Sequence, residues 1–502
     1  MIAPPPSCDS LPHNEPKKLE EIWPTGIWGR RRLAKFSVSE IDLLTWRELS
    51  RLIRKRLQVF HPRQTPVDRL ARKRFAKKIL KNIRRKRWKH GSHPLPKRLL
   101  AARKKESKLL SAFYPSRETQ WKSLQNRKRK EYIISAKGFS LIETPLDAIN
   151  ILREIAKAEA LALQLRLNFS DEICLDVSPY LILGLMKADM APIVRGGNIS
   201  TAVTAMVDAV NLSSFLEIGK INRSQKTHPP YWPFKIHFRR GKGKSKSNDI
   251  SQQPSSDEAI LDSLIDTIEG WLRKFKRPLS DDHKRAIHGM ISEALNNAER
   301  HSDLETRDGD WAIAGFLSSL SSADEKQDKY YCSLSVVSLG ASIHESLSKC
   351  EDPGTVKSME SYIERHRKKA HMSREALTSV FALQDRVSRF KQGDGSSAGG
   401  IGLMDMIQWV NEMGRHASSD APPAITLLSG KVCIKIAPPY TDLISYDCDK
   451  PRNLWFNEHN SLEQPPDRKY VMTLPISFPG TAVAIRFCIR EDGAEIKQAG
   501  GI

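Results

Sequence analysis

Cysteine is scarce in this chain, and its positions form no pattern. Seven cysteines are spread over 502 residues, with no Cys-x-x-Cys pair and no Cys/His spacing of the kind that zinc sites use. We therefore do not expect a zinc site. Several of the cysteines fall within apolar strand patterns, where we expect them to be small core side chains.

Long apolar runs are also missing. No stretch approaches the length of about 20 apolar residues that a membrane-spanning helix needs, and the first residues, MIAPPPSCDSLPHNEP, do not resemble a signal peptide. No strongly amphipathic helix with a bulky apolar face is apparent, so a membrane surface is not an expected partner. We interpret the chain as cytoplasmic.

Several arrangements of catalytic residues are absent from the sequence. We find no nucleophile elbow, no carboxylate pair at the spacing of glycosidases, no metal-ligating cluster and no phospho-accepting histidine helix. The last absence argues against a sensor kinase. No internal repeat is visible either.

Acidic residues are nearly missing from residues 51–130. This basic segment holds 29 Lys and Arg residues against Asp68, Glu106 and Glu118, a net charge of +26, whereas the whole chain carries +23. The rest of the chain is therefore close to neutral. A dense basic segment with interspersed aromatic residues attracts phosphate backbones. We expect it to bind nucleic acid, with DNA and RNA both open.

The length predicts more than one domain. Residues 1–38 are rich in proline and are expected to be disordered, and residues 39–138 are expected to form a basic helical region. Residues 139–238 show the helix and strand patterns of a small α/β domain, and 239–256 read as a flexible Gly/Ser/Lys linker. Residues 257–495 complete a chain of α/β (α+β) class with a mixed sheet backed by helices.

The segment ISEALNNAERHS, residues 291–302, carries the strongest functional pattern. Glu293, Asn297 and His301 stand at i, i+4 and i+8 on one helical face, beside an apolar stripe at helical spacing. The amide oxygen of Asn297 can bind Mg²⁺, and the carboxylate of Glu293 can orient or deprotonate an attacking water. His301 either contacts phosphate or caps the end of the helix.

Two segments with glycine follow. YYCSLSVVSLGAS (330–342) predicts a strand that runs into a turn, and DGSSAGGIGLMDMIQWV (394–410) predicts a glycine-rich loop that opens a helix. The backbone N–H groups of such a loop can approach phosphate oxygens, and a helix N-terminus favours negative charge. Between them lies a charged helical segment from Val356 to Phe390. AITLLSGKVCIKI (424–436) predicts a hairpin about Ser429 and Gly430.

In this order and spacing, the segments resemble the GHKL, or Bergerat-fold, ATPases, which include gyrase and the catalytic domains of histidine kinases. The resemblance covers roughly residues 257–490. It implies a GHKL-like α/β sandwich that binds ATP and Mg²⁺, with Glu293 as general base, Asn297 as magnesium ligand and residues 356–390 in the position of a mobile lid. The nucleotide-binding residues that it implies are Asn297, His301, Ser338, Gly340, Gly399, Gly400, Ile401, Gly402, Leu403 and Thr481.

One position departs from the family pattern in a way that bears on function. Ser338 stands where the family has an aspartate that reads the adenine amino group, and Ser342 stands where it has a second glycine. A hydroxyl can still accept a hydrogen bond, but it discriminates less than a carboxylate. Nucleotide binding is then kept, altered in base preference or lost, and the presence of Glu293 and Asn297 favours the first two outcomes.

Two other functions stay open. The C-terminal domain is alternatively a catalytically degenerate scaffold for protein or nucleic-acid interaction, or a Ser/Thr protein kinase of the anti-sigma type. Residues 171–194 loosely resemble STAS domains but lack the Asp-Ser pair of the phosphorylated members, and an ordinary α/β packing domain explains them equally. Members of the GHKL family often dimerise, so a protein partner or a homodimer is compatible with the resemblance.

Overall fold

The computed structural model describes residues 106–117, 124–125, 132–161, 163, 165–190, 193–216, 231–239, 257–273, 310–320, 329–385, 387, 402–414, 422–445 and 451–490, with 51, 70, 74, 76–78, 80–81, 92–93, 281, 284, 288 and 291. Six of the expected site residues lie outside this set: Glu293, Asn297, His301, Gly399, Gly400 and Ile401. Residues 1–38, residues 240–256 and most of the basic segment also lie outside it.

The chain is an α/β protein, and its parallel strands form a small sheet of their own. This sheet has the order β3-β4-β5, made by Tyr132–Ala136, Leu165–Phe169 and Val194–Gly196. Helices α6 (Pro145–Ala160) and α7 (Ser178–Lys187) make the two crossovers that parallel pairing requires. A short two-stranded sheet, β1 (Ser92–His93) with β2 (Leu124–Gln125), precedes it.

The second sheet is larger and antiparallel at every described pairing. Its order is β6-β7-β8-β10-β9, with the bounds Tyr231–Arg239, Asp310–Leu320, Lys329–Leu339, Val471–Arg490 and Ala424–Ile436. We expected one mixed C-terminal sheet. Parallel and antiparallel pairings instead occupy separate sheets, because only the part of the chain with helical crossovers can pair its strands in parallel.

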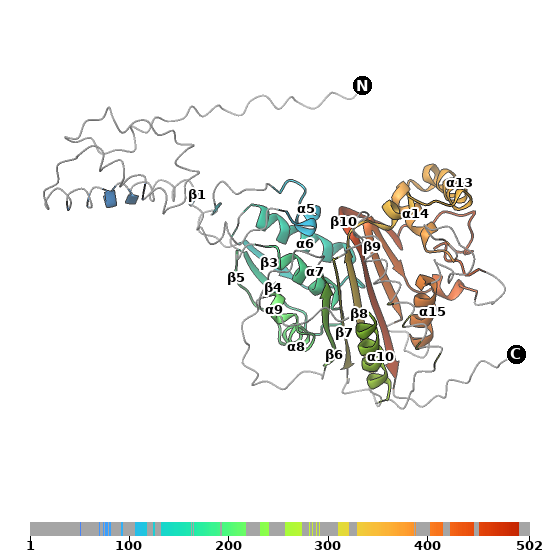
Figure 1. Cartoon of the computed structure of the whole chain (residues 1–502), viewed down its shortest axis with the longest axis horizontal. Coiled ribbons are helices and arrows are strands. Elements are labelled where there is room, and N and C mark those ends of the chain that lie inside the picture. Colours follow the sequence, from blue (N-terminus) through green and yellow to red (C-terminus); the bar gives the residue numbers. More distant parts are fainter. Residues whose placement is uncertain are drawn as a thin grey trace, which may run out of the picture.

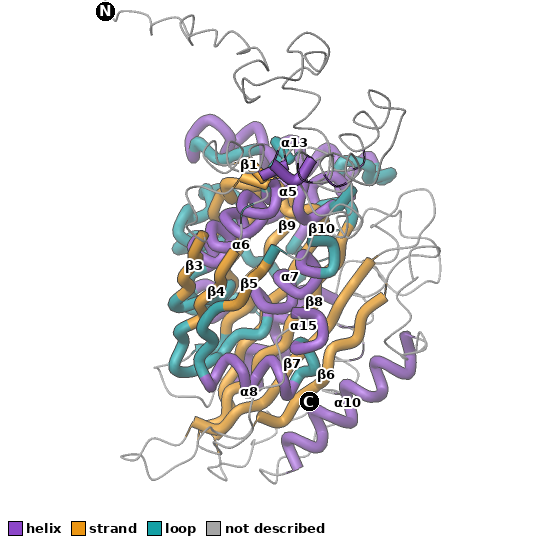
Figure 2. The backbone as a smooth tube through the Cα atoms, turned by 90° about the vertical axis from the view of Figure 1, so that its left-hand side faces the viewer, coloured by secondary structure: helices purple, strands orange, loops and turns teal. Residues whose placement is uncertain are grey.

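The two sheets and their helices form successive layers (Figure 1). Helices α5 (Lys108–Phe113), α6 and α7 lie between the sheets, and α8 (Thr201–Ala209) contacts β6. The other face of the large sheet is covered by α10, α13, α14 and α15, which are Asp257–Arg273, Pro353–Ala370, Arg374–Ala382 and Gly402–Gly414. Figure 2 shows α10 alongside the edge strand β6. The short helices are α9 (Ser213–Leu216), α12 (Ile343–Leu347) and the 3-10 turn η2 (Tyr440–Leu443).

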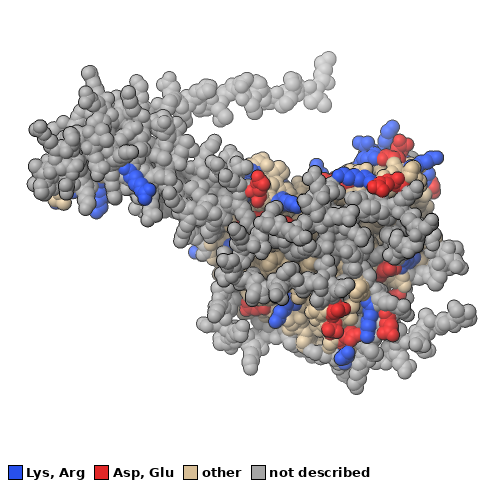
Figure 3. Space-filling view, in the orientation of Figure 1, with Lys and Arg blue, Asp and Glu red and all other residues tan. Residues whose placement is uncertain are grey.

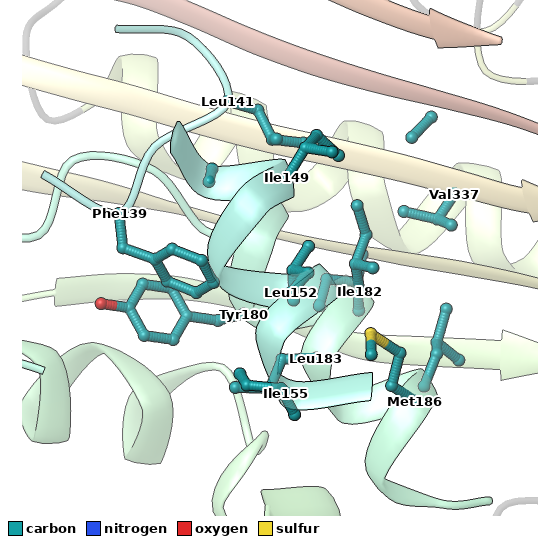
Figure 4. Close-up of a cluster of buried hydrophobic side chains, with 14 of the residues drawn as sticks. Phe139, Leu141, Ile149, Leu152, Ile155, Tyr180, Ile182, Leu183, Met186 and Val337 are labelled. Atoms are coloured by element: carbon teal, nitrogen blue, oxygen red, sulfur yellow. The ribbon is translucent and has the colours of Figure 1, made fainter. Parts of the chain in front are cut away.

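Helix α7 is buried on all sides because it lies between the two sheets. Every one of its residues is buried, which explains why the sequence SPYLILGLMK has no polar face. Figure 4 shows Ile182, Leu183 and Met186 of α7 packed with Leu152 and Ile155 of α6, and Val337 of β8 beside them. Full burial of each such aliphatic side chain contributes about 1.5–3 kcal/mol to folding.

The large sheet presents small side chains to these helices, so the layers approach closely. The residues of this face include Ala312, Ala314, Ser333, Ser335, Thr426, Ala482 and Ala484, all nearly inaccessible. At the N-terminal end of α7, the backbone N–H of Val177 donates to Ser333 Oγ at 3.2 Å. This bond ties the parallel-sheet layer to β8. The described helices include none that is both long and apolar enough to cross a membrane.

Strand β6 places the boundary of the C-terminal unit differently from the sequence interpretation. Residues 139–238 were expected to form a separate domain that ends at a linker, yet Tyr231–Arg239 is the edge strand of the large sheet and pairs with β7. Strand β3 and helix α5 likewise belong to the parallel-sheet layer, although they fall within the expected basic region 39–138. Strand pairing at this sequence distance leaves no local signal.

The segment expected as a mobile lid is part of the core. Met359, Tyr362 and Ile363 of α13 and Leu377 and Val380 of α14 are buried in the cluster on the helical face of the large sheet. The excursion that follows β9, described over residues 437–445 and 451–470, packs against the same helices. Trp455 lies 5.0 Å from Tyr362 between ring centroids.

Residues 424–436 form one strand and not a hairpin. Strand β9 continues through Gly430, whose φ is +55°, and its pairing with β10 shifts register at this point. The shift faces Pro475 and Pro479 of β10, which cannot donate to a ladder. The hairpin prediction was wrong because a glycine with positive φ serves here as a kink within a long strand and not as a turn.

Candidate functional site

A row of three hydroxyl side chains crosses the large sheet near the end of β8. Thr481 of β10 pairs with Ser338 of β8 on one side and with Ser429 of β9 on the other. Their neighbours two residues away, Val336 and Val483, belong to the core beneath α13, α14 and α15. Because side chains alternate along a strand, the polar row (Ser338, Thr481 and Ser429) faces the helical side of the sheet.

Hydrogen bonds connect the members of the polar row. Ser338 Oγ donates to the carbonyl oxygen of Thr481 at 3.2 Å. Ser429 Oγ accepts the backbone N–H of Ile343 at 2.8 Å and lies 3.1 Å from both the Gly480 carbonyl oxygen and Thr481 Oγ1. Ser429 is buried, whereas Ser338 and Thr481 are half-buried. Ser338 and Thr481 are therefore the members that a ligand can reach.

Gly480 lets the end of β8 lie directly against β10. Its φ is +119°, and a Cβ at this position would come within 2.1 Å of the Ser338 carbonyl oxygen and 2.7 Å of the Gly340 nitrogen. The Gly340 N–H donates to the carbonyl oxygen of Pro479 at 3.1 Å. Three positions expected from the sequence, Ser338, Gly340 and Thr481, are thus brought together by β8 and β10.

Ser342, where the family pattern has a glycine, has a structural task. Its hydroxyl accepts the N–H of Glu345, and the Glu345 carboxylate accepts the N–H of Ser342, which is a complete capping box for α12. The φ of Ser342 is −71°, so the position does not require glycine. The departure from the family pattern at residue 342 is therefore explained by local structure.

Helix α15 begins directly after the glycine-rich loop. It starts at Gly402, and Leu403 is half-buried against the helical-side core. Trp409 anchors the helix on the sheet, with its ring 5.2 Å from that of Phe487 between centroids. Among the described residues, neither Gly402 nor Leu403 hydrogen-bonds to the polar row.

Two charged groups near this region had no sequence signal. Glu375, in the first turn of α14, accepts the backbone N–H of Lys431 through Oε1 at 2.6 Å. Arg452 binds both oxygens of Asp385, at 3.0 and 3.1 Å, and Asp405 at 2.7 Å. Burial alone would lower the pKa of Arg452, but its bonds to the two carboxylates outweigh burial and raise that pKa.

The described cysteines are core residues, as expected from their strand patterns. Cys174, Cys332, Cys433 and Cys488 are buried. Burial raises the pKa of the Cys174 and Cys332 thiols well above the ordinary range, and that of Cys433 to about 12. These thiols are neutral near pH 7, so they do not act as nucleophiles.

Comparison of the chain with protein-family models, with curated proteins and with solved structures gave no match. Within the described part of the chain, no group of three or more His, Cys, Asp or Glu side chains is arranged to hold a metal ion. The functional argument therefore depends on the polar row and the charged side chains around it. What this arrangement offers chemically is two accessible hydroxyls, which donate and accept hydrogen bonds, and a carboxylate from a neighbouring helix.

Proposed function

We propose that the chain is an Mg-ATP-binding switch protein of the GHKL type, whose basic segment binds nucleic acid. The observation that carries the proposal is the pairing of Ser338 with Thr481 across β8 and β10. The resemblance assigns both residues to the adenine site although 142 residues separate them in the sequence. Their half-buried hydroxyls on the helical face, next to Gly340, suit a nucleotide base lying against the sheet.

The order of elements also supports the proposal. Strands β7 and β8 precede the helices α13 to α15, and β10 then inserts between β8 and β9. All of these helices cover one face of the sheet, as the resemblance implies for a nucleotide site between sheet and helices. Glu293 would be the general base and Asn297 the magnesium ligand. With both present, slow hydrolysis accompanies binding.

Calorimetry of ATP binding in the presence of Mg²⁺ tests the nucleotide site. The full chain is used, because β6 and the parallel-sheet layer share cores with the C-terminal strands. We expect a Kd of about 1–100 μM for the wild type and a loss of at least about tenfold for Asn297→Ala, since Mg²⁺ loses an oxygen ligand. Asn198→Ala, at an exposed position of the parallel sheet, is the matched control and should bind normally. Absence of binding at millimolar ATP would contradict the proposal.

The charge of the described basic segment supports nucleic-acid binding. The exposed charged residues described between 51 and 81 are Arg51, Arg74, Lys77, Lys78 and Lys81, all basic. At the left of Figure 3 the coloured charges of this part are blue, whereas blue and red are interspersed over the C-terminal layers. A segment of one charge sign binds phosphate backbones by counterion release.

A salt titration tests this part of the proposal. We expect the affinity of the full chain for a fluorescent 20-nucleotide DNA or RNA to fall steeply with salt. The triple variant Lys77→Gln, Lys78→Gln and Lys81→Gln should reduce the slope of log K against log salt by roughly 1 for each lysine that no longer binds a phosphate.

The matched control neutralises three exposed lysines of the C-terminal half, Lys349→Gln, Lys357→Gln and Lys368→Gln. It removes the same net charge from a different surface. Equal effects of the two triple variants would reduce the basic segment to a contribution of net charge, and would overturn its role as the binding site.

A degenerate scaffold is the second candidate, because two observations favour it. The segment that the resemblance implies as a mobile lid is packed in the core through residues such as Tyr362 and Leu377, and β8 offers a hydroxyl where the family has a carboxylate. A scaffold does not need Glu293. Identical ATP turnover by the wild type and Glu293→Ala, or no turnover by either, would favour the scaffold over the hydrolase.

A further inference from the structure

We propose that Glu375 of α14 supplies the carboxylate that recognises the amino group of the nucleotide base. This inference rests on the proposed function and concerns the specificity of the same site. Strand β8 carries only a hydroxyl at Ser338. The structure brings a carboxylate to the opposite, β9 end of the polar row, from an element that the sequence resemblance does not connect with base recognition.

Helix α14 holds Glu375 in place. Ser373 caps the helix, with its Oγ accepting the N–H of Ala376 at 3.1 Å. Leu377 and Val380, on the buried side of the helix, pack in the core over β9 and β10. The carboxylate therefore starts from a fixed first turn and not from a loop. Its position relative to the sheet is set by packing.

One oxygen of Glu375 has a structural partner that the sheet itself does not provide. The register of β9 against β10 shifts between the pairs Val432–Thr473 and Gly430–Phe478, and Lys431 has no ladder partner between them. Glu375 Oε1 accepts the N–H of Lys431 at 2.6 Å in place of a strand carbonyl. This contact accounts for one oxygen of the carboxylate only.

The second oxygen is available. Within the described part of the chain, Glu375 Oε2 makes no hydrogen bond or ion pair, and the side chain is half-buried. An ionised carboxylate has about four acceptor sites on its two oxygens and no donor. A half-buried carboxylate oxygen gains from a charge-assisted bond to an N–H of a ligand. It gains nothing from a carbonyl, which also only accepts.

The carboxylate lies where a base along the polar row would end. A Cβ at Gly430, next to Ser429, would come within 1.9 Å of Glu375 Oε1 and 3.3 Å of the Ser342 Cβ. Neighbouring strands are about 4.8 Å apart, so the β9 end is about 10 Å from Ser338. A purine between Ser338 and Glu375 meets two hydroxyls that tolerate either polarity, followed by one group that accepts only. Discrimination between an amino and an oxo substituent then falls to Glu375.

The test compares ATP with ITP, which carries an oxo group in place of the 6-amino group. Binding of each to the full chain with Mg²⁺ is measured by calorimetry for the wild type, Glu375→Gln and Glu364→Gln. We expect the wild type to prefer ATP by at least about tenfold, the effect of one lost hydrogen bond to a charged group. Glu375→Gln should reduce the preference to about twofold or less, because an amide offers both a donor and an acceptor. Glu364, exposed on α13, is the matched control.

The ratio of the two affinities separates recognition from a structural role. If Glu375 only satisfied Lys431, its replacement would weaken both nucleotides equally and leave the ratio unchanged, and that result would overturn the inference alone. No binding of either nucleotide to the wild type would overturn the proposed function together with it. If Glu375→Gln does not fold, Glu375→Asp takes its place. The shorter side chain cannot hold both Lys431 and the ligand, so an unchanged ratio there also overturns the inference.

Discussion

Replacing Arg117 by alanine is expected to destabilise the protein by about 3–5 kcal/mol, because it leaves a buried carboxylate without its cation. The Arg117 guanidinium binds Glu159 through two nitrogens, at 2.7 and 3.1 Å. The side chains are 1% and 0% exposed. The pair connects the chain after α5 to the last turn of α6. A urea-unfolding midpoint, with the m value, measures the loss.

Two comparison variants identify the cause of this loss. Lys157→Ala removes a partner of Glu154 in a pair whose side chains are 42% and 38% exposed, so we expect a cost below about 1 kcal/mol. The double variant Arg117→Met with Glu159→Leu removes both buried charges and should recover most of the stability. If the double variant were as unstable as Arg117→Ala, the cost would come from lost packing and not from an unpaired charge.

The sequence predicted those elements of the fold whose cores lie on one helical face or within one strand. The pattern of Ile149, Leu152 and Ile155 gave α6, and the apolar strand before Gly340 gave β8, because both patterns are local. Strand β6 was assigned to the wrong layer for the opposite reason. Its partner β7 begins at Asp310, about 70 residues later, and only tertiary pairing links the two.

The candidate site divides in the same way. Ser338, Gly340 and Thr481 could be located from the resemblance, since each stands within a short motif next to a glycine. Glu375 and Arg452 could not. The contact of Glu375 with Lys431 depends on a register shift in β9, and Arg452 meets Asp385 and Asp405 only after the chain beyond β9 folds back on α14 and α15. Motifs report local chemistry, whereas these contacts are produced by packing.

Gly480→Ala is expected to cost about 4 kcal/mol and to abolish nucleotide binding, because two penalties act at one position. A φ of +119° costs a residue with a Cβ roughly 1–3 kcal/mol. The added Cβ would also lie 2.1 Å from the Ser338 carbonyl oxygen and 2.9 Å from the Leu339 Cα, both backbone atoms that cannot turn away. Forcing them apart adds about 1–3 kcal/mol. It also moves Ser338 away from Thr481.

Gly196→Ala separates the two penalties. Gly196 has a φ of +136°, close to that of Gly480, but a Cβ there would meet no atom within 4 Å. It should therefore show the backbone cost alone and leave nucleotide binding unchanged. The difference between the two urea-unfolding free energies is then the steric cost of separating β8 from β10. If both variants lost the same stability and both bound ATP, close contact at Gly480 would not be what holds Ser338 and Thr481 together, and the hydrogen bond from Ser338 to the Thr481 carbonyl would have to maintain the geometry of the polar row.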